Sequence, residues 1–217
     1  MSSTTENYLK RILSETQRTG NHVVRLGRLA ELSDVTNGTV TTMMKSLSDS
    51  DLVEYLPRRG VKLTTTGRKN ATRVLRRHRL VELFLVEVLG FDWAGVHSEA
   101  EVLEHAVSDR IINRMDEVLG FPATDPHGDP IPTASGKVAR TMNRLLSEVT
   151  SPGEFIISRI INDDPRFLDF LKKRSLTPGT RIEVFQCDRI AQTIEIRADD
   201  VVTLSLAVAA RIHVTNA

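Results

Sequence analysis

The stretch VHSEAEVLEH, residues 96–105, concentrates side chains that can bind a divalent cation. If it forms a helix, in which each residue turns about 100°, four of its side chains project from about a third of the circumference. These four are His97, Glu101, Glu104 and His105. Two imidazoles and two carboxylates in so small a space repel one another when charged and are poorly solvated when buried. A divalent cation removes both problems, because it binds neutral imidazole nitrogens and anionic oxygens.

A second pair of the same kind lies upstream, in RRHRLVELFLVEVL, residues 76–89. His78 and Glu82 are one helical turn apart on a segment whose other positions are mostly apolar. Two such pairs on neighbouring helices could complete one coordination sphere. The competing interpretation is that these are ordinary solvated helix residues, with His78 on the face that contacts water.

The composition is that of a globular protein, with 40% hydrophobic and 26% charged residues in 217. No apolar run approaches the ~18–20 residues of a membrane span. The first residues, MSSTTENYLKRI, lack the apolar core of a signal peptide. A single cysteine, Cys187, excludes an internal disulfide, and we interpret it as a buried or half-buried strand residue. We therefore expect a cytoplasmic protein that contacts no membrane.

The net charge of +1 conceals an asymmetry along the chain. Residues 1–77 hold 14 basic and 7 acidic side chains, whereas residues 78–217 hold 15 basic and 21 acidic ones. A basic first third favours binding to a phosphate backbone. The acidic remainder favours binding of a cation.

The N-terminal third predicts a helix-turn-helix. The periodicity indicates an amphipathic helix over 4–17, a short helix over 26–32, a turn at 33–35 and a second helix over 36–48. Small polar residues in the first turn of that second helix would let it enter the major groove closely. The residues of this region that we expect to contact DNA are Arg28, Thr36, Asn37, Gly38, Thr39, Thr42 and Lys45.

A hairpin follows the helix-turn-helix. Leu52–Leu56 and Val61–Thr64 are short alternating runs, and a turn containing Gly60 separates them. Arg58 and Arg59 at its tip are suited to phosphate or minor-groove contact. Two helices, a turn and a hairpin in this order predict a winged helix-turn-helix.

The middle of the chain predicts two long helices. One runs from Arg68 to about Leu89, where Gly90 stops it, and the other follows Gly95 and continues to about Leu119. Their apolar residues exceed what one small domain needs, which predicts a two-fold dimer interface. The residues of this surplus are Leu83, Leu85, Val86, Val88, Ile111, Ile112 and Met115.

The last third predicts a small β-barrel or sandwich. Gly120–Ser135 is a loop rich in Pro, Gly and Asp, and Lys137–Val149 is either a short helix or a linker. After it come short runs rich in Val, Ile and Thr, separated by turn signals, with one short helix over Asp164–Lys172. The expected strands are Phe155–Ile161, Arg181–Gln186, Thr193–Ile196, Val201–Leu204 and Ala209–Val214.

Taken in order, these pieces resemble the diphtheria toxin repressor family of metal-dependent transcriptional regulators. The resemblance covers about residues 4–132 and rests on TTENYL, TVTTMM, LTTTGR, RRHRLVE, VHSEAEVLEH and PHGDPIP. It implies an α+β multidomain protein that is not an enzyme and that binds a double-stranded DNA operator as a homodimer, with no small-molecule substrate. The implied domains are a winged helix-turn-helix (1–75), a helical metal-binding and dimerisation domain with linker (76–149) and an SH3-like β-barrel (150–217).

The resemblance also implies two metal sites per subunit. One would use Asn7, Glu101, Glu104 and His105. The other would use His78, Glu82 and His97, with Asp163 or Asp164 near the position of a ligand from the third domain. Binding at the first site would pin the N-terminal helix and so set the spacing of the two recognition helices.

Three positions bear on which metal is sensed. The iron-sensing members carry a cysteine where this chain has Glu101, so the sequence looks closer to the manganese transport regulators. The family usually has Asp or Met in place of Asn7, whose amide oxygen can ligate but has no charge. Short manganese regulators have Glu in place of Lys10, which argues against a closely spaced two-metal cluster and for two separated sites.

The expected cofactor is Mn²⁺, with Fe²⁺ as the alternative, because the expected ligands offer oxygen and nitrogen but no sulfur. Two other classes of function remain open at this point. A metalloenzyme is disfavoured because the chain lacks the His-Glu-x-x-His motif and the paired Glu-x-x-His motifs of di-iron bundles. A winged-helix regulator that answers an organic effector would not be stabilised by Mn²⁺.

Overall fold

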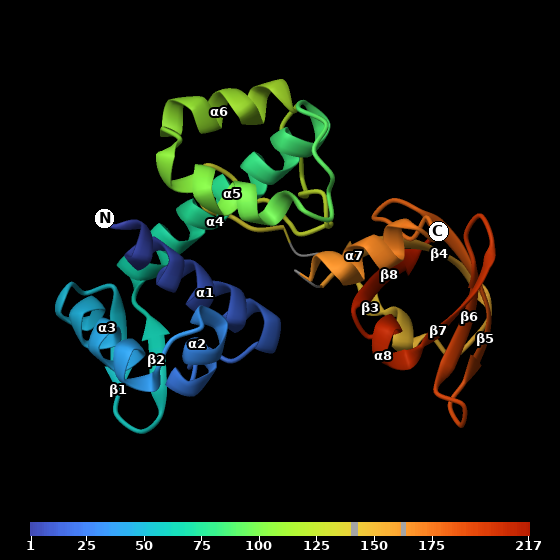
Figure 1. Ribbon diagram of the computed structural model, residues 1–217, viewed down its shortest axis with the longest axis horizontal. Helices are drawn as coiled ribbons and strands as arrows, with labels where there is room; N and C mark the ends of the chain where they lie inside the picture. Colours follow the sequence, from blue (N-terminus) through green and yellow to red (C-terminus); the bar gives the residue numbers. More distant parts are fainter. Residues whose placement is uncertain (140–142, 162–163) are drawn as a thin grey trace. The chain divides into compact units, whose positions relative to one another are not determined.

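A computed structural model describes residues 1–139, 143–161 and 164–217 of the chain (Figure 1). These residues form two compact units. The first comprises Met1–Arg77 with Pro132–Lys137, and the second comprises His78–Ile131 with Val138–Ala217. Helix α4, Thr65–Glu87, contributes residues to both.

The first unit is a winged helix-turn-helix. Its helices are α1 (Ser3–Thr19), α2 (Leu26–Ser33) and α3 (Asn37–Asp49), followed by strands β1 (Val53–Leu56) and β2 (Gly60–Leu63). The helices bury one apolar face each around a common core that includes Leu9, Leu29 and Met44. This arrangement agrees with the order of elements expected from the sequence.

Local signals fix where these helices begin and end. The Ser2 side chain accepts a hydrogen bond from the Thr5 amide, and Gly20 ends α1 in the left-handed conformation. Asp34 ends α2 in the same conformation, and Thr36 caps α3 by accepting from the Thr39 amide at 3.2 Å. The turn between α2 and α3 is therefore defined on both sides by polar caps.

In the second unit, α5 spans Val96–Ala106 and α6 spans Asp109–Val118. The prediction of one helix continuing to Leu119 is wrong. Val107 is extended, and Ser108 caps α6 by accepting from the Ile111 amide at 3.4 Å. Ser108 followed by Asp109 is an N-cap signal, and this signal overrides the continuous apolar periodicity.

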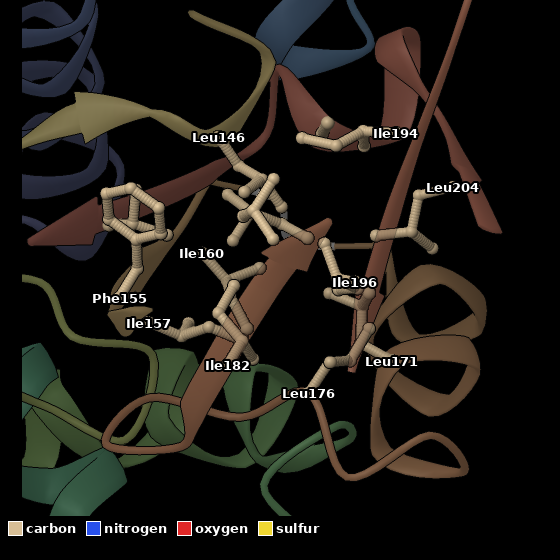
Figure 2. Packing of buried hydrophobic residues seen from close by; sticks show 14 of the residues in the cluster. Leu146, Phe155, Ile157, Ile160, Leu171, Leu176, Ile182, Ile194, Ile196 and Leu204 are labelled. Atoms are coloured by element: carbon tan, nitrogen blue, oxygen red, sulfur yellow. The ribbon is translucent and has the colours of Figure 1, made fainter. Parts of the chain in front are cut away.

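The C-terminal part of this unit is an antiparallel sheet in the order β3-β8-β4-β5-β6-β7. Its strands are β3 (Arg144–Leu145), β4 (Gly153–Ile160), β5 (Arg181–Asp188), β6 (Thr193–Arg197), β7 (Val201–Ser205) and β8 (Ile212–Asn216). Alternate residues of these strands point into one apolar core, which Figure 2 shows around Ile157, Ile182 and Ile196. Helix α7 (Pro165–Lys172) contributes Leu168 and Leu171 to the same core, and Cys187 lies half-buried on β5 as expected.

Two further predictions need correction or completion. Residues 206–209 form a short helix, α8 (Leu206–Ala209), whose N-cap is Ser205, so the last strand begins at Ile212 and not at Ala209. The segment predicted as a helix or linker, Lys137–Val149, forms β3 and the 3-10 turn η1 (Leu146–Glu148), while residues 140–142 lie outside the described residues. Among the described residues, no helix combines the length and the apolar character of a membrane span.

The first turn of α4 packs directly on the backbone that precedes β1. A Cβ added at Gly67 would overlap the carbonyl oxygen of Leu52, whereas a Cβ at Gly27 on α2 would meet only the Asn37 side chain at 3.8 Å. Both glycines are helical, so they form a matched pair in which only the packing differs.

We therefore expect Gly67→Ala to lower the free energy of unfolding by roughly 1–3 kcal/mol, because the backbone must shift to accommodate the methyl group. Gly27→Ala should be neutral or stabilising by up to about 1 kcal/mol, because alanine favours a helix. Urea unfolding followed by circular dichroism measures both. Equal stabilities of the two variants would show that this close approach does not constrain the fold.

Candidate metal centre and DNA-binding face

Three donor atoms from α4 and α5 meet in a triangle. His78 Nε2 lies 3.1 Å from Glu82 Oε1, and His97 Nδ1 lies 3.0 Å from that oxygen and 3.1 Å from His78 Nε2. Separations of about 3 Å equal the edge of an octahedron whose metal–ligand bonds are about 2.1 Å. His78, Glu82 and His97, which we call the histidine cluster, therefore have a spacing that could hold a divalent cation.

The histidine cluster lies in the interior and carries charge. His78 and Glu82 are buried, and His97 is half-buried. Burial raises the pKa of the Glu82 carboxyl, but His78 and His97 outweigh this effect and hold that pKa well below its usual range. Glu82 is therefore ionised, which is the state that a cation requires of a ligand.

A second group of donors shares Glu82. Glu82, Asp125 and His127, which we call the aspartate cluster, are all buried, and one ligand atom from each lies within 4.8 Å of the others. Asp125 and His127 belong to a turn between α6 and β3, where Asp125 Oδ1 accepts from the His127 and Asp129 amides at 2.9 Å. Two carboxylates and one imidazole again form a donor set for a hard or borderline cation.

The carboxyl group of Asp125 differs from that of Glu82 in its protonation. Burial raises the pKa of Asp125 well above its usual range, and the neighbouring carboxylates of Asp129 and Glu82 raise it further. The Arg79 guanidinium, whose Nε lies 3.5 Å from Asp125 Oδ2, opposes this effect. A proton on Asp125 thus neutralises a charge that a bound cation would otherwise neutralise.

The residues expected to form the first metal site differ in burial and belong to both compact units. Glu104 is fully buried, with Oε2 at 2.6 Å from His78 Nδ1 and Oε1 at 3.3 Å from His105 Nε2. Glu101 is partly exposed, and its Oε1 lies 3.7 Å from His97 Nε2. Asn7 lies on α1, in the first unit. Glu104 thereby connects the expected first site to His78, which the family resemblance places in the second.

The expected ligand from the third domain has another role in the structure. Asp164 is the N-cap of α7, where its side chain accepts from the Arg166 amide at 2.9 Å, and it belongs to neither cluster. Asp163 lies outside the described residues. Asp125 and His127 were not among the expected ligands, although an aspartate and a histidine two residues apart in a Pro/Gly-rich turn are a signal of a candidate metal site.

The expected DNA-binding residues of α3 lie on one exposed face. Asn37, Gly38, Thr39, Thr42 and Lys45 are exposed, while Val40, Met44 and Leu47 face the core. The hydroxyl groups of Thr36 and Thr39 lie 3.0 Å apart, and Thr42 donates to the Gly38 carbonyl at 3.1 Å.

The other residues expected to contact DNA are arginines, and they differ in whether they are already held in ion pairs. Arg58 and Arg59 are exposed at the tip of the β1–β2 hairpin, where Arg58 has φ +63°. Strand β2 of this hairpin is joined to the segment before α2 by two backbone hydrogen bonds between Val24 and Val61. Arg28 is held in ion pairs with Glu31 at 3.0 Å and Glu15 at 3.4 Å, so a contact between Arg28 and DNA would compete with these carboxylates.

The apolar surface expected to form a dimer is partly interior. Leu85 and Ile112 are buried in the core of the helical part, whereas Val88 and Ile111 are about half exposed. A cavity of about 340 Å³ beside Ile111 is lined by residues of α4 and α6. They are Phe84, Arg110, Ile111, Arg114, Met115 and Val118.

Three successive segments of the chain match known domain families. Residues 1–61 match the N-terminal DNA-binding domain of iron-dependent repressors, and residues 64–133 match the metal-binding and dimerisation domain of those repressors. Residues 144–216 match the FeoA domain.

Individual relatives include regulators of both iron and manganese. The iron-dependent repressor IdeR of Mycobacterium leprae is 33% identical over 193 residues, which cover 83% of each chain. The diphtheria toxin repressor of Corynebacterium diphtheriae is 37% identical over 129 residues, covering 59% of this chain and 56% of that one. The structure of a manganese-dependent transcriptional repressor in complex with manganese is 37% identical with a TM-score of 0.90, covering 98% of this chain and all of that one.

The raised pKa of Asp125 predicts that metal binding releases a proton. Between the usual carboxyl range and its raised pKa, Asp125 is protonated without metal and must be ionised to bind one. The affinity for Mn²⁺ should therefore increase with pH over this interval. Calorimetric titrations in two buffers of different ionisation enthalpy measure the number of protons released.

Asp125→Asn should reduce this release, whereas Asp164→Asn, a change outside both clusters, should leave it as in the unmodified protein. The same proton release from Asp125→Asn as from the unmodified protein would exclude Asp125 as its source.

Proposed function

We propose that this chain, which belongs to the diphtheria toxin repressor and IdeR family of metal-dependent transcriptional repressors, represses transcription in response to Mn²⁺. The observation that carries the proposal is the triangle formed by His78 Nε2, Glu82 Oε1 and His97 Nδ1. Glu82 Oε1 can accept hydrogen bonds from both imidazoles, but His78 Nε2 and His97 Nδ1 would then both carry protons at 3.1 Å from each other. A cation shared by two deprotonated nitrogens and the carboxylate removes this conflict.

The choice of Mn²⁺ rests on the chemistry of the donors. Both clusters offer carboxylate oxygens and imidazole nitrogens, and among the described residues the lone cysteine, Cys187, belongs to neither. Such a set suits Mn²⁺ or Fe²⁺ and disfavours Cu(I). Glu101 supplies a further oxygen, and a relative of high structural similarity is described as binding manganese. Because Zn²⁺ would bind such donors more tightly than Mn²⁺, selectivity in the cell depends on geometry and on metal supply.

The proposal includes two sites in each subunit. The regulatory site uses Asn7, Glu101, Glu104 and His105. The second site centres on Glu82, with ligands from the histidine cluster or the aspartate cluster. His78 contacts both Glu82 and Glu104, so the two sites share a residue and are expected to influence each other.

The regulatory site would act through α1. When bound, the cation supplies positive charge among carboxylates that otherwise repel one another. Glu104 and His105 belong to α5, and Asn7 belongs to α1, so ligation by all three would restrict α1 relative to the dimerisation domain. The protein then populates the arrangement that fits DNA, and linkage requires DNA to raise the affinity for metal by the same factor.

DNA recognition would use the exposed face of α3 and the arginines of the hairpin. Thr39, Thr42 and Lys45 would meet the major groove, and Arg58 and Arg59 would meet the backbone or the minor groove. A homodimer would present two such faces to a two-fold operator. The apolar cavity between α4 and α6, with Ile111 and Val118 about half exposed, is a suitable surface for a second copy.

Metal dependence of DNA binding tests this function directly. Mn²⁺ should raise the affinity for operator DNA by at least about 10-fold over chelator-treated protein, as measured by fluorescence anisotropy with DNA selected by the Mn²⁺-loaded protein. Glu104→Gln should abolish most of the increase, because Glu104 is buried and linked to His78 and His105. Glu99→Gln, an exposed position on the same helix, is the matched control and should respond normally. DNA affinity that is independent of metal would refute the proposal.

The identity of Glu101 should set the metal preference. Glu101→Cys should shift activation from Mn²⁺ toward Fe²⁺ or softer ions, because a thiolate is a softer ligand than a carboxylate. Val102→Cys adds the same thiol at the next position, which is 71% exposed, and should leave the preference unchanged. Anaerobic titrations of DNA binding with each metal measure the effect. Preferential activation of the unmodified protein by Fe²⁺ would instead make it an iron-responsive member of the family.

A further inference from the structure

The turn that carries Asp125 and His127 is seated on the edge of the C-terminal sheet. Strand β4 pairs with β5 only as far as Ile156, which lies opposite Arg181. At the end of β4, the Ile160 amide donates to the His127 carbonyl at 2.9 Å, and the amide of the next residue, Ile161, donates to the Arg211 carbonyl beside β8. Successive amides of a strand point to opposite edges, so the turn occupies the edge that β5 has left. His127 is thereby held through its backbone by the C-terminal sheet.

Gly128 permits this close approach. It has φ +84°, and a Cβ at this position would overlap the Ser158 carbonyl oxygen and lie 2.8 Å from the Arg159 Cα. Both atoms belong to the backbone of β4, which cannot move aside as a flexible side chain can. The next residue, Asp129, is held by Arg159 of β4 at 2.6 Å and by Arg79 of α4 at 3.2 Å.

The His127 ring is oriented from another side. Its Nε2 lies 3.0 Å from the carbonyl oxygen of Trp93, and a carbonyl only accepts, so Nε2 carries the proton and Nδ1 is left to bind a cation. Trp93 itself packs against the apolar core of the C-terminal sheet, and its ring centroid is 5.3 Å from that of His127. Backbone and ring of His127 therefore both depend on that sheet.

We infer that the C-terminal sheet domain is a positioning element for the metal-binding turn, in which the β4 edge, through Gly128 and Arg159, sets the aspartate cluster for a divalent cation. The inference rests on the proposed metal-dependent function and assigns a task to the C-terminal domain within it. By linkage, a cation bound by Glu82, Asp125 and His127 tightens the seating of the turn on β4, and a loosened turn weakens the binding of that cation.

Gly128→Ala is the first test, with Gly120→Ala as its matched control. Both glycines have left-handed φ values, +84° and +73°, but a Cβ at Gly120 would meet nothing within 4 Å. Gly128→Ala should weaken Mn²⁺ binding to one of the two proposed sites about 10–100-fold, the range typical of lost support around a ligand. Gly120→Ala should bind both ions normally. Calorimetry gives the affinities, and the emission of Trp93, the only tryptophan in the sequence, reports on binding beside His127.

Arg159→Gln provides a second test that introduces no overlap. It removes the ion pair with Asp129 and should weaken the same Mn²⁺ site, whereas Arg181→Gln, which removes an exposed pair with Glu154 on the same sheet, should not. If Gly128→Ala fails to fold, the comparison of these two arginine variants decides the inference.

Hydrogen exchange of the Ile160 amide tests the reciprocal effect. Mn²⁺ should slow this exchange several-fold in the unmodified protein and leave it unchanged in Asp125→Asn. The positioning role would be overturned if Gly128→Ala and Arg159→Gln both bound Mn²⁺ as tightly as the unmodified protein does. It would also be overturned if Mn²⁺ left the exchange rate of the Ile160 amide unchanged in the unmodified protein. Such a result alongside metal-dependent DNA binding would leave the proposed function intact, whereas the absence of any Mn²⁺ binding would refute both.

Discussion

Glu82 is a buried acid on which two groups of side chains that could hold a metal ion converge. His78 and His97 approach it from α4 and α5, and Asp125 and His127 approach it from the turn after α6. A carboxylate in the interior must be paired or it becomes neutral, since an isolated buried charge is too costly. The packing of the second unit therefore depends on how the charge of Glu82 is compensated, by imidazoles, by protons or by a cation.

The neighbouring charges show how much compensation is required. Asp125, Asp129 and Glu82 lie close together, and two arginines, Arg79 and Arg159, are directed at this group from α4 and β4. Arg79 also donates to the Pro130 carbonyl, so it fastens the turn as well as balancing its charge. Such an interior is well suited to sensing a cation, because adding or removing one positive charge alters several buried interactions together.

The C-terminal domain takes part in this arrangement through its backbone. Its sheet contacts the turn of Asp125 and His127 at the β4 edge, and its core includes Trp93 and Ala94 from the helical part. The ion pair between Lys172 on α7 and Asp92, at 2.9 Å, adds a contact at the surface. A domain held at so many points beside the aspartate cluster is expected to respond to a change of charge in that cluster.

The local features of this protein could be predicted from its sequence. The helical spacing of His78 with Glu82 and of His97 with Glu101 predicted which side chains share a helix face, and the structure places the first pair within 3.1 Å. The order of helices, turn and hairpin predicted the winged helix-turn-helix, and the spacing of short apolar runs predicted the C-terminal sheet. These properties follow from backbone periodicity and capping. Both act within a few residues, so they can be identified in the sequence.

Tertiary structure alone decided how distant residues meet. Asp125 and His127 join Glu82 because the Pro/Gly-rich turn folds back onto α4, and no periodic pattern relates a turn to a helix so far away in sequence. Asp164 became the cap of α7 because that helix needed a side-chain acceptor at its first turn. The predicted continuous helix divided at Ser108 because a capped start at Asp109 outweighed the apolar periodicity across it. Partners of a loop are chosen by packing and by the charges that packing must neutralise, so only the folded chain reveals them.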